Sequence, residues 1–279
     1  MASGDDLLLV CVHYRTPAET ERFVVSALEQ RTRAPVRITV VDNSPSPAKQ
    51  AIPASVRAFD RLRILDPGTN LGYFGAAAFA LRDHLVSHSH PTWVVISNPD
   101  IRFADNLTLE HLSGLHAGHE PGVLAPSIRS ARSGMNQNPF MRRRPSRVRM
   151  HFYRWMFSSY PSDVVYQSLH WLKQQTARGR PLGLPSESGE VEPIYAAHGS
   201  FLAFHRSYFE RGGTLGHGAF LFGEEIFVAE TARRLGLAVL FEPRVIVEHA
   251  EHSSMGPLWR RETSDRRREA SRYLANTFF

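Results

Sequence analysis

Trp93-Val94-Val95-Ile96-Ser97-Asn98-Pro99-Asp100 joins an apolar run to a proline turn that ends in a carboxylate. The apolar part, rich in β-branched residues, predicts a buried strand. Where parallel strands are flanked by helices, ligands lie outside the carboxyl ends of the strands, so Asp100 would face a ligand there. A β-turn in which Pro99 and Asp100 only cap the next helix explains this stretch equally well when it is taken alone.

Strands and helices alternate around this stretch. Short apolar runs predict strands, and longer amphipathic runs predict helices. Strands are expected at Leu7–His13, Val36–Val41, Arg61–Leu65, Trp93–Ser97, within the block Ile194–His205, and at Ala238–Phe241 and Val245–His249; helices are expected after Thr16 and at Phe74–Leu85 and Glu224–Leu235. The alternation up to residue 120 indicates an α/β fold, with a mainly parallel sheet flanked by helices.

Length and composition limit the classes of protein to consider. With 279 residues the chain is close to the upper limit for one hydrophobic core, so we expect one large domain with at most a small appendage. The single cysteine, Cys11, cannot form an internal disulfide and lies in an apolar run that suits a core strand. No apolar run is long enough to span a bilayer and no basic signal region precedes one, so the expected compartment is the cytoplasm.

The chain is basic, with a formal net charge of +6 and a pI near 9.8. This suits an anionic partner: a nucleotide, a nucleic acid or an anionic lipid surface. Arginines and aromatic residues alternate in residues 129–190, which fits a helix on the inner face of a membrane. A helical module packed on the rest of the chain, or on a second subunit of a homo-oligomer, fits equally well. No nucleic-acid-binding motif accompanies these residues, so no nucleic acid is expected as a partner.

Polar residues follow the predicted strands where a ligand would lie. They are Tyr14, Asp42-Asn43, Asp66 to Asn70, and Asn98 to Asp100. Asp42 could accept a hydrogen bond from a nucleobase or ribose, or Asp42 and Asn43 could only shape a turn. Residues 70–75, with two glycines before a helix, could meet a phosphate through backbone N–H groups or simply allow close packing.

Two further groups could carry chemistry. Asp100 could hold a hard divalent cation, which binds one or two carboxylates together with substrate phosphates, and His249 could be a further ligand or a surface histidine. Glu224 and Glu225 follow an aromatic loop at a helix start, where the helix dipole alone would favour acidic residues. One of the pair could instead act as a general base.

The order of these motifs resembles that of the family 2 glycosyltransferases, especially the bacterial branch with rhamnosyl- and galactofuranosyl-transferases. The resemblance runs from Leu7 to about Ser254, with a gap over residues 129–190. It rests on Val40-Val41-Asp42-Asn43-Ser44, Asn70-Leu71-Gly72-Tyr73-Phe74-Gly75, Asn98-Pro99-Asp100, Gly199-Ser200-Phe201-Leu202-Ala203-Phe204-His205-Arg206, Phe222-Gly223-Glu224-Glu225 and His249-Ala250-Glu251-His252-Ser253-Ser254.

The resemblance implies a GT-A fold and assigns roles to these positions. Nucleotide-sugar binding falls to Tyr14, Asp42, Asn43, Asn70, Gly72, Tyr73, Asn98 and Asp100, and acceptor binding to His198, Gly199, Ser200 and Phe222. The divalent cation, Mg²⁺ or Mn²⁺, falls to Asp100 and His249, and the catalytic base to Glu225 with Glu224 as the second candidate. Two departures bear on the base: Glu225 stands where the family has Asp, and Phe227 replaces a following Asp. A third puts His252 where the family has Gly.

The implied domains are a nucleotide-sugar-binding half (1–128), the basic and aromatic insertion (129–190), an acceptor and catalytic half (191–256) and a C-terminal helix (257–279). The implied reaction is inverting transfer of a sugar from a UDP- or dTDP-sugar to a saccharide or lipid-linked saccharide in cell-surface polysaccharide synthesis. Two other classes stay open: a sugar-nucleotide-binding module without catalysis, and a nucleic-acid-binding protein.

Overall fold

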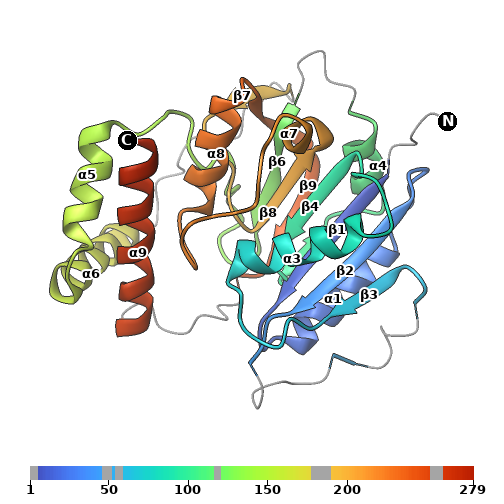
Figure 1. The fold of residues 1–279 in the computed structure, drawn as a ribbon, viewed down its shortest axis with the longest axis horizontal. Helices are drawn as coiled ribbons and strands as arrows, with labels where there is room; N and C mark the ends of the chain where they lie inside the picture. The colour runs from blue at the N-terminus through green and yellow to red at the C-terminus, as the bar shows by residue number, and fades with distance from the viewer. Residues whose placement is uncertain (1–5, 46–51, 54–58, 116–120, 177–189, 252–259) are drawn as a thin grey trace.

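The computed structural model describes residues 6–45, 52–53, 59–115, 121–176, 190–251 and 260–279. Its centre is a twisted sheet in which the described strands follow the order β3-β2-β1-β4-β8-β6-β9-β5, with β7 also paired to β9. Figure 1 shows helices on both faces of this sheet and a further group of helices beyond one of its sides. The observed fold is therefore the α/β sheet flanked by helices that the sequence predicts.

The N-terminal half contains four parallel strands. They are β1 (Leu7–His13), β2 (Val36–Asp42), β3 (Leu62–Leu65) and β4 (Trp93–Ser97), and all pairs among them are parallel. Every residue of β1 is buried, because helices cover both faces of a parallel sheet. Cys11 lies in this strand and belongs to the core, as expected.

Helices α1 (Pro17–Leu28) and α3 (Tyr73–Leu85) pack on opposite faces of these strands. Helix α1 begins at a proline, whose fixed φ and missing N–H suit a first helical position. Its apolar face buries Phe23, Val24 and Ala27. Helix α3 buries Phe74 and a run of alanines, which lets the helix approach the sheet closely. Because β1 pairs parallel with both β2 and β4, the carboxyl ends of these three strands meet at one edge of the sheet.

The second half of the sheet is mixed. It consists of β5 (Ile101–Phe103), β6 (Pro121–Ser130), β7 (Glu192–Ile194), β8 (Phe201–His205) and β9 (Ala238–His249). Strand β8 runs antiparallel to β4 and β6, whereas β6 and β9 are parallel. This half differs from the mainly parallel sheet expected from sequence, because strands buried on both faces have the same apolar pattern in either direction.

Strand β9 replaces the two separate strands expected at 238–241 and 245–249. The chain continues through Pro243, where the register against β6 shifts between Pro126 and Ser127. A proline is tolerated at such an irregularity, since no ladder hydrogen bond from its nitrogen is needed there. Strand β6, which the sequence did not indicate, runs across the expected domain boundary at residue 128.

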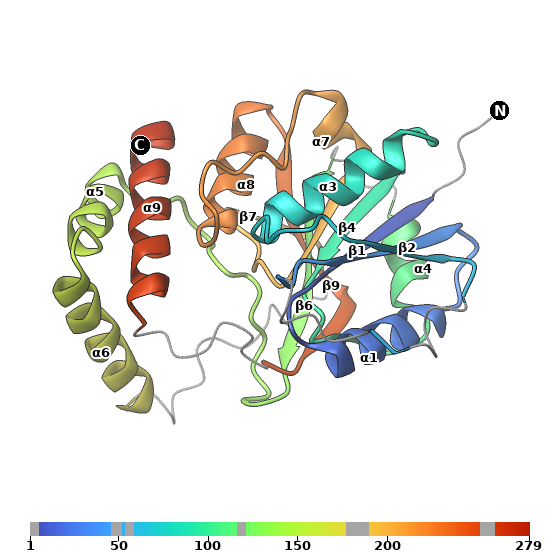
Figure 2. The same ribbon diagram turned by 60° about the horizontal axis from the view of Figure 1, so that its bottom comes forward.

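Helices α5 (Arg147–Met156), α6 (Tyr160–Thr176) and α9 (Arg261–Phe278) form the outer group. Both views place them beyond α8 (Glu224–Arg234), with α9 between α8 and the other two (Figures 1 and 2). A buried ion pair joins α6 to α9, with 2.7 Å between Asp163 Oδ2 and Arg267 Nη2. Two short helices, α4 (Thr108–Ser113) and α7 (Arg206–Glu210), complete the described elements.

Within the described ranges, no helix is both long and apolar enough to cross a membrane.

Candidate active site

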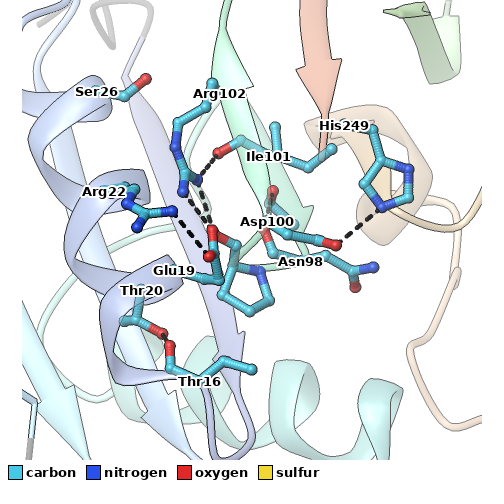
Figure 3. Close-up of polar contacts among 12 residues, drawn as sticks. Thr16, Glu19, Thr20, Arg22, Ser26, Asn98, Asp100, Ile101, Arg102 and His249 are labelled. Carbon is cyan, nitrogen blue, oxygen red and sulfur yellow. Dashed lines mark hydrogen bonds and ion pairs between the residues drawn. The ribbon is translucent and has the colours of Figure 1, made fainter. Parts of the chain in front are cut away.

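The Asn98-Pro99-Asp100 turn leaves β4 at the edge of the sheet and leads directly into β5. Arg102 holds this turn from the side, because its guanidinium donates to the carbonyl oxygens of Pro99 and Ile101. The same guanidinium is anchored on α1, with 2.7 Å between its Nη2 and Glu19 Oε2 (Figure 3). On the other side, the Asn98 N–H donates to the Ser200 carbonyl over 2.9 Å. The turn is thus fixed by α1 and by the segment before β8.

Asp100 and His249 converge at this turn. Asp100 directly precedes β5, and His249 ends β9. These strands pair antiparallel, with Ile101 opposite His249, and Asp100 Oδ2 lies 3.3 Å from His249 Nε2 (Figure 3). Both residues are buried, to 5% and 8% exposure. The structure therefore brings together the two residues that the sequence proposes as cation ligands.

The tautomer of His249 is set by a relay of two further residues. Gln137 donates from Nε2 to Glu251 Oε1 over 2.9 Å, and a carboxylate only accepts, so Gln137 Oε1 faces the histidine. His249 Nδ1 lies 2.8 Å from that oxygen and must carry the proton. In the neutral ring His249 Nε2 then faces the Asp100 carboxylate with its lone pair, a position that a proton or a cation can occupy. Metal-bound histidines typically have this arrangement, in which the second ring nitrogen donates to an outer partner.

The residues present fit a hard divalent cation. A lone pair facing a carboxylate oxygen is unfavourable unless a proton or a cation lies between them. Among the described residues no group of three or more His, Cys, Asp or Glu side chains could hold a metal ion. A pair of protein ligands still suits Mg²⁺ or Mn²⁺, because such ions commonly complete their shell with substrate phosphates and water.

His198 extends this cluster towards β8. Its ring lies 5.8 Å from the His249 ring, and its Nδ1 lies 2.9 Å from Ser200 Oγ. Burial and the neighbouring His249 lower the pKa of His198 to about 4, so its imidazole is neutral at physiological pH. The backbone N–H of His198 donates to Asn138 Oδ1, which is itself buried. His198 and Ser200, predicted as acceptor residues, therefore lie beside the Asp100 and His249 pair.

Gly199 brings Glu225 to the same place. A Cβ atom at position 199 would lie 2.8 Å from Glu225 Oε1, so the carboxyl group fills the space that a side chain would need. Burial raises the pKa of Glu225, opposed by hydrogen bonds from backbone groups that include Gly199. Burial and the charge of Glu225 raise the pKa of Glu224 to about 8. A carboxyl pair with raised pKa values can take up a proton near neutral pH, as a general base must.

The loop before the glutamates has an unusual backbone. Phe222 has a φ of 73° and Gly223 a φ of 81°, and helix α8 begins at the next residue. A positive φ at a large residue is strained and often marks a functional loop. Two contacts hold it: His217 Nε2 lies 2.9 Å from the Phe222 carbonyl oxygen, and the Arg267 guanidinium lies over the Phe222 ring. Phe222, predicted to bind acceptor, thus lies on a loop fixed from two sides.

Asp42 ends β2 and Tyr14 follows β1, at the edge where Asn98 follows β4. Strand β1 lies between the other two, with His13 opposite Asp42 and Cys11 opposite Ser97. Asp42 Oδ1 lies 3.7 Å from His13 Nε2 and accepts a hydrogen bond from the Ser44 N–H. The Tyr14 ring stacks with the Arg15 guanidinium, 5.0 Å from its centroid. A nucleoside bound at this edge would lie two strands away from Asp100.

Asn43 and Asn70 form a clamp rather than an open contact surface. Both hydrogens of the Asn43 amide are donated inside the protein, to Asn70 Oδ1 and to the Gly72 carbonyl, and its oxygen accepts from the Leu71 N–H. Asn70 Oδ1 also accepts from the Gly72 N–H. Asn43 therefore shapes the 70–72 loop, and its expected contact with the nucleotide-sugar donor stays a prediction.

Gly72 and Tyr73 join this loop to the segments around the glutamates. Gly72 has a φ of 74° and lies against the Phe220 carbonyl, where a Cβ would clash with the backbone. Tyr73, which the resemblance assigns to the nucleotide-sugar site, donates its hydroxyl hydrogen to the Gly199 carbonyl over 3.0 Å. Burial, together with the charge of Glu224, raises the pKa of Tyr73. The hydroxyl group therefore keeps its proton and can donate this hydrogen bond. The 70–73 loop thus supports the Gly199 and Phe220 segments.

Sequence patterns did not indicate Arg102, Gln137, Asn138 or Glu251 as part of this site. Gln137 and Asn138 lie in an irregular segment without periodicity. The only sequence signal for Glu251 is its position two residues after His249. The only one for Arg102 is its position two residues after Asp100. His252, the third departure from the family pattern, lies outside the described residues.

The chain is similar in sequence to two known glycosyltransferases. No protein-family model matches the chain. It is 25% identical over 257 residues to the N-acetylglucosaminyl-diphospho-decaprenol L-rhamnosyltransferase of Mycobacterium tuberculosis, covering 90% of this chain and 78% of that protein. It is 24% identical over 233 residues to the low-salt glycan biosynthesis hexosyltransferase Agl10 of Haloferax volcanii, covering 82% of this chain and 62% of that protein.

Similar solved structures extend the comparison to the fold. A mannosyltransferase from Pyrobaculum calidifontis, in complex with GDP-Man and Mn²⁺, matches 91% of this chain with a TM-score of 0.53 and 17% identity. GalNAc-T7, with UDP, GalNAc and Mn²⁺, matches 90% with a TM-score of 0.57 and 13% identity. The chain spans 59% of the first protein and 44% of the second, which is less than two thirds of either.

The fold is therefore that of the GT-A glycosyltransferases. The similarity in sequence to the rhamnosyltransferase and the hexosyltransferase supports both the resemblance to family 2 and glycosyltransferase activity.

Proposed function

We propose that the protein is an inverting glycosyltransferase that moves a sugar from a UDP- or dTDP-sugar to a hydroxyl of a saccharide or lipid-linked saccharide. The observation that carries the proposal is the convergence of Asp100 and His249, with His249 Nε2 3.3 Å from a carboxylate oxygen and Nδ1 2.8 Å from Gln137 Oε1. The Gly199 segment connects this pair to the Glu225 carboxyl group. A cation site next to a buried base is what displacement of a diphosphate by a hydroxyl requires.

The donor diphosphate would be held by Asp100 and His249 through Mg²⁺ or Mn²⁺. The cation would supply electrostatic stabilisation of the negative charge that develops on the leaving diphosphate. Asp42 would accept a hydrogen bond from the nucleoside at the ends of β1 and β2. Asn43, Asn70 and Gly72 would keep the adjoining loop in place, and Arg102 would keep the Asp100 turn aimed at the diphosphate.

Glu225 would remove the proton from the acceptor hydroxyl as the hydroxyl oxygen attacks the anomeric carbon. The bond from that carbon to the diphosphate oxygen breaks as the new bond forms on the opposite face, so the anomeric configuration inverts. His198, Ser200 and Phe222 would border the acceptor. Because the pKa of His198 is lowered to about 4, its ring would contribute hydrogen bonds and not a charge.

The acceptor is proposed from the relatives as well as from the site. The similar mycobacterial protein is named for a lipid-linked acceptor, a decaprenol diphosphate carrying N-acetylglucosamine. We propose a related lipid-linked saccharide here, which would bring the protein to the inner face of a membrane for cell-surface polysaccharide synthesis. The domain divisions given above are proposed on the same basis.

Transfer of radiolabelled sugar from a panel of UDP- and dTDP-sugars, with and without Mn²⁺, tests the proposal. We expect transfer to a saccharide acceptor with one donor, loss on chelation, and a product of inverted anomeric configuration by NMR. Tight, metal-dependent donor binding without transfer or hydrolysis for any acceptor would instead support the binding module without catalysis.

A further inference from the structure

The outer faces of α5 and α6 each expose a stripe of large apolar side chains. On α5 these are Val148, Phe152 and Trp155, exposed to 80%, 45% and 65%, and on α6 they are Val165, Leu169 and Leu172, exposed to 55%, 62% and 54%. In both helices the members are spaced i, i+4 and i+7, which places them on one face. Water-exposed stripes of this kind are unusual on a protein that leaves them unpartnered.

These stripes point away from the rest of the molecule. At 100° per residue, the α5 stripe lies opposite Met150 and Tyr153, and Met150 is buried. The α6 stripe lies opposite Asp163, which pairs with Arg267 of α9. Figures 1 and 2 both show α5 and α6 outside α9. The apolar residues therefore do not belong to the packing between these helices and the catalytic domain.

Aromatic side chains between α5 and α6 join these two helices into one unit. The Tyr166 ring lies 5.1 Å from the Phe157 ring and 6.0 Å from the Tyr153 ring, nearly perpendicular to both. Such edge-to-face contacts fix the relative positions of α5 and α6. The two stripes are consequently held on a common rigid support.

Basic residues surround the α5 stripe. Helix α5 contains Arg147, Arg149, His151 and Arg154 and no acidic residue. An open pocket of about 460 Å³ between α5 and α9 is lined by His151, Arg154, Trp155, Ser158, Arg268 and Arg272. Its lining holds three guanidinium groups and no carboxylate. Arg268 pairs through Nη2 with Asp265 Oδ1, next to the pocket, and its Nε is buried without a hydrogen-bond partner among the described residues. This composition suits a phosphate group, because guanidinium groups bind phosphate through several N–H donors.

We propose that the outer face of α5 and α6 docks on an anionic membrane, with a lipid phosphate in the pocket of Arg154, Arg268 and Arg272. Apolar side chains beside cationic groups, with Trp155 where the two meet, are the composition that lies at a lipid interface. A neutral apolar protein surface would cover the apolar side chains and leave the arginines unpaired. A polar acidic surface would pair with the arginines and leave the apolar side chains uncovered. The choice of occupant rests on this charge complementarity.

Docking there would serve the active site through α9. The Arg266 guanidinium lies 4.2 Å from the Phe220 ring centroid, and Leu274 fills the space beside Gly223. Both contacts reach the loop that leads to Glu224 and Glu225. This step rests on the proposed function, because a link between the membrane and that loop affects transfer only if the acceptor is lipid-linked.

Flotation of the full chain with vesicles tests the proposal. We expect binding to vesicles of phosphatidylcholine and phosphatidylglycerol in equal parts, and little binding to phosphatidylcholine alone. The double variants Arg154→Glu/Arg272→Glu and Phe152→Ser/Trp155→Ser should each weaken binding by about tenfold or more. Arg31→Glu/Arg33→Glu, with the same change of charge on exposed residues far from α5, is the matched control and should bind nearly as the wild type does.

Two outcomes would overturn the proposal: equal vesicle binding by all four proteins with unchanged folding by circular dichroism, or displacement from vesicles by glycerol phosphate or a short oligonucleotide at lower concentration than lipid. Transfer to a water-soluble acceptor is measured in parallel. The docking variants should retain it, so a loss of vesicle binding is separable from a failure of the proposed transfer.

Discussion

His249 Nε2 lies 3.3 Å from Asp100 Oδ2, while His249 Nδ1 donates its proton to Gln137 Oε1. The second contact explains the first. In the neutral ring the glutamine keeps the proton on Nδ1, so that Nε2 faces the carboxylate with its lone pair. Because Glu251 orients the glutamine amide in turn, four residues from three segments define the geometry of the proposed cation site.

Gln137→Leu should weaken Mn²⁺ binding about 10- to 100-fold, because the leucine removes the acceptor that fixes the His249 tautomer. Titration calorimetry with Mn²⁺ in the presence of UDP measures this directly. Met135→Leu, at an exposed position two residues away, is the control and should change nothing. Unchanged Mn²⁺ affinity in the Gln137 variant would show that His249 does not bind the cation.

Asp100→Asn should abolish the part of nucleotide-sugar affinity that depends on the metal. The amide keeps the size of the side chain and removes the charge that a hard cation needs. Binding of the donor is compared by calorimetry with Mn²⁺ and with EDTA, and the variant should give the wild-type EDTA value in both. A variant that still responds to Mn²⁺ as the wild type does would exclude Asp100 as a ligand.

Glu225→Gln should lower the rate of transfer about 10²- to 10⁴-fold, the range that a general base contributes, and leave donor affinity near the wild-type value. Glu224→Gln is the matched variant, and its rate should fall less. Single-turnover assays at saturating donor separate the chemical step from binding. If the Glu224 variant loses more activity than the Glu225 variant, the base is Glu224.

The raised pKa of Glu224 also predicts how stability depends on pH. Its folded pKa of about 8 lies above the ordinary value of 4.5, so the folded state binds the proton more tightly than the unfolded state does. The stability linked to this proton is complete below pH 4.5 and is lost as the pH rises through about 8. Melting temperatures measured from pH 5 to 9 should fall less in Glu224→Gln than in the wild type. Parallel curves would mean that Glu224 titrates normally.

The sequence predicted the strands and the residues that follow them better than their arrangement. Asp42, Asn98 and Asp100 could be placed at one edge, because carboxyl ends of parallel strands meet there. The antiparallel direction of β8 and the continuous β9 could not be predicted, since burial on both faces hides direction and Pro243 suggests a break.

Contacts between distant segments account for the rest of the site. Asp100 meets His249 only because β5 pairs with β9, and no pattern in either segment indicates that pairing. Gln137 has no periodic signal and becomes recognisable only through its two hydrogen bonds. Asn43 and Tyr73 were recognised by motif, but their role depends on partners in loops, which single positions do not encode.

Gly199→Ala should lower the turnover number, because the new methyl group would lie 2.8 Å from Glu225 Oε1 and must displace that carboxyl group. A displacement of about 1 Å can cost about a hundredfold in rate, while the donor site, on the other strands, should keep its affinity. Glu225→Asp is one methylene shorter and removes the clash. The double variant Gly199→Ala/Glu225→Asp should therefore be more active than Gly199→Ala alone. Steady-state kinetics of the wild type, both single variants and the double variant measure this coupling, and additive losses would show that Gly199 and Glu225 act independently.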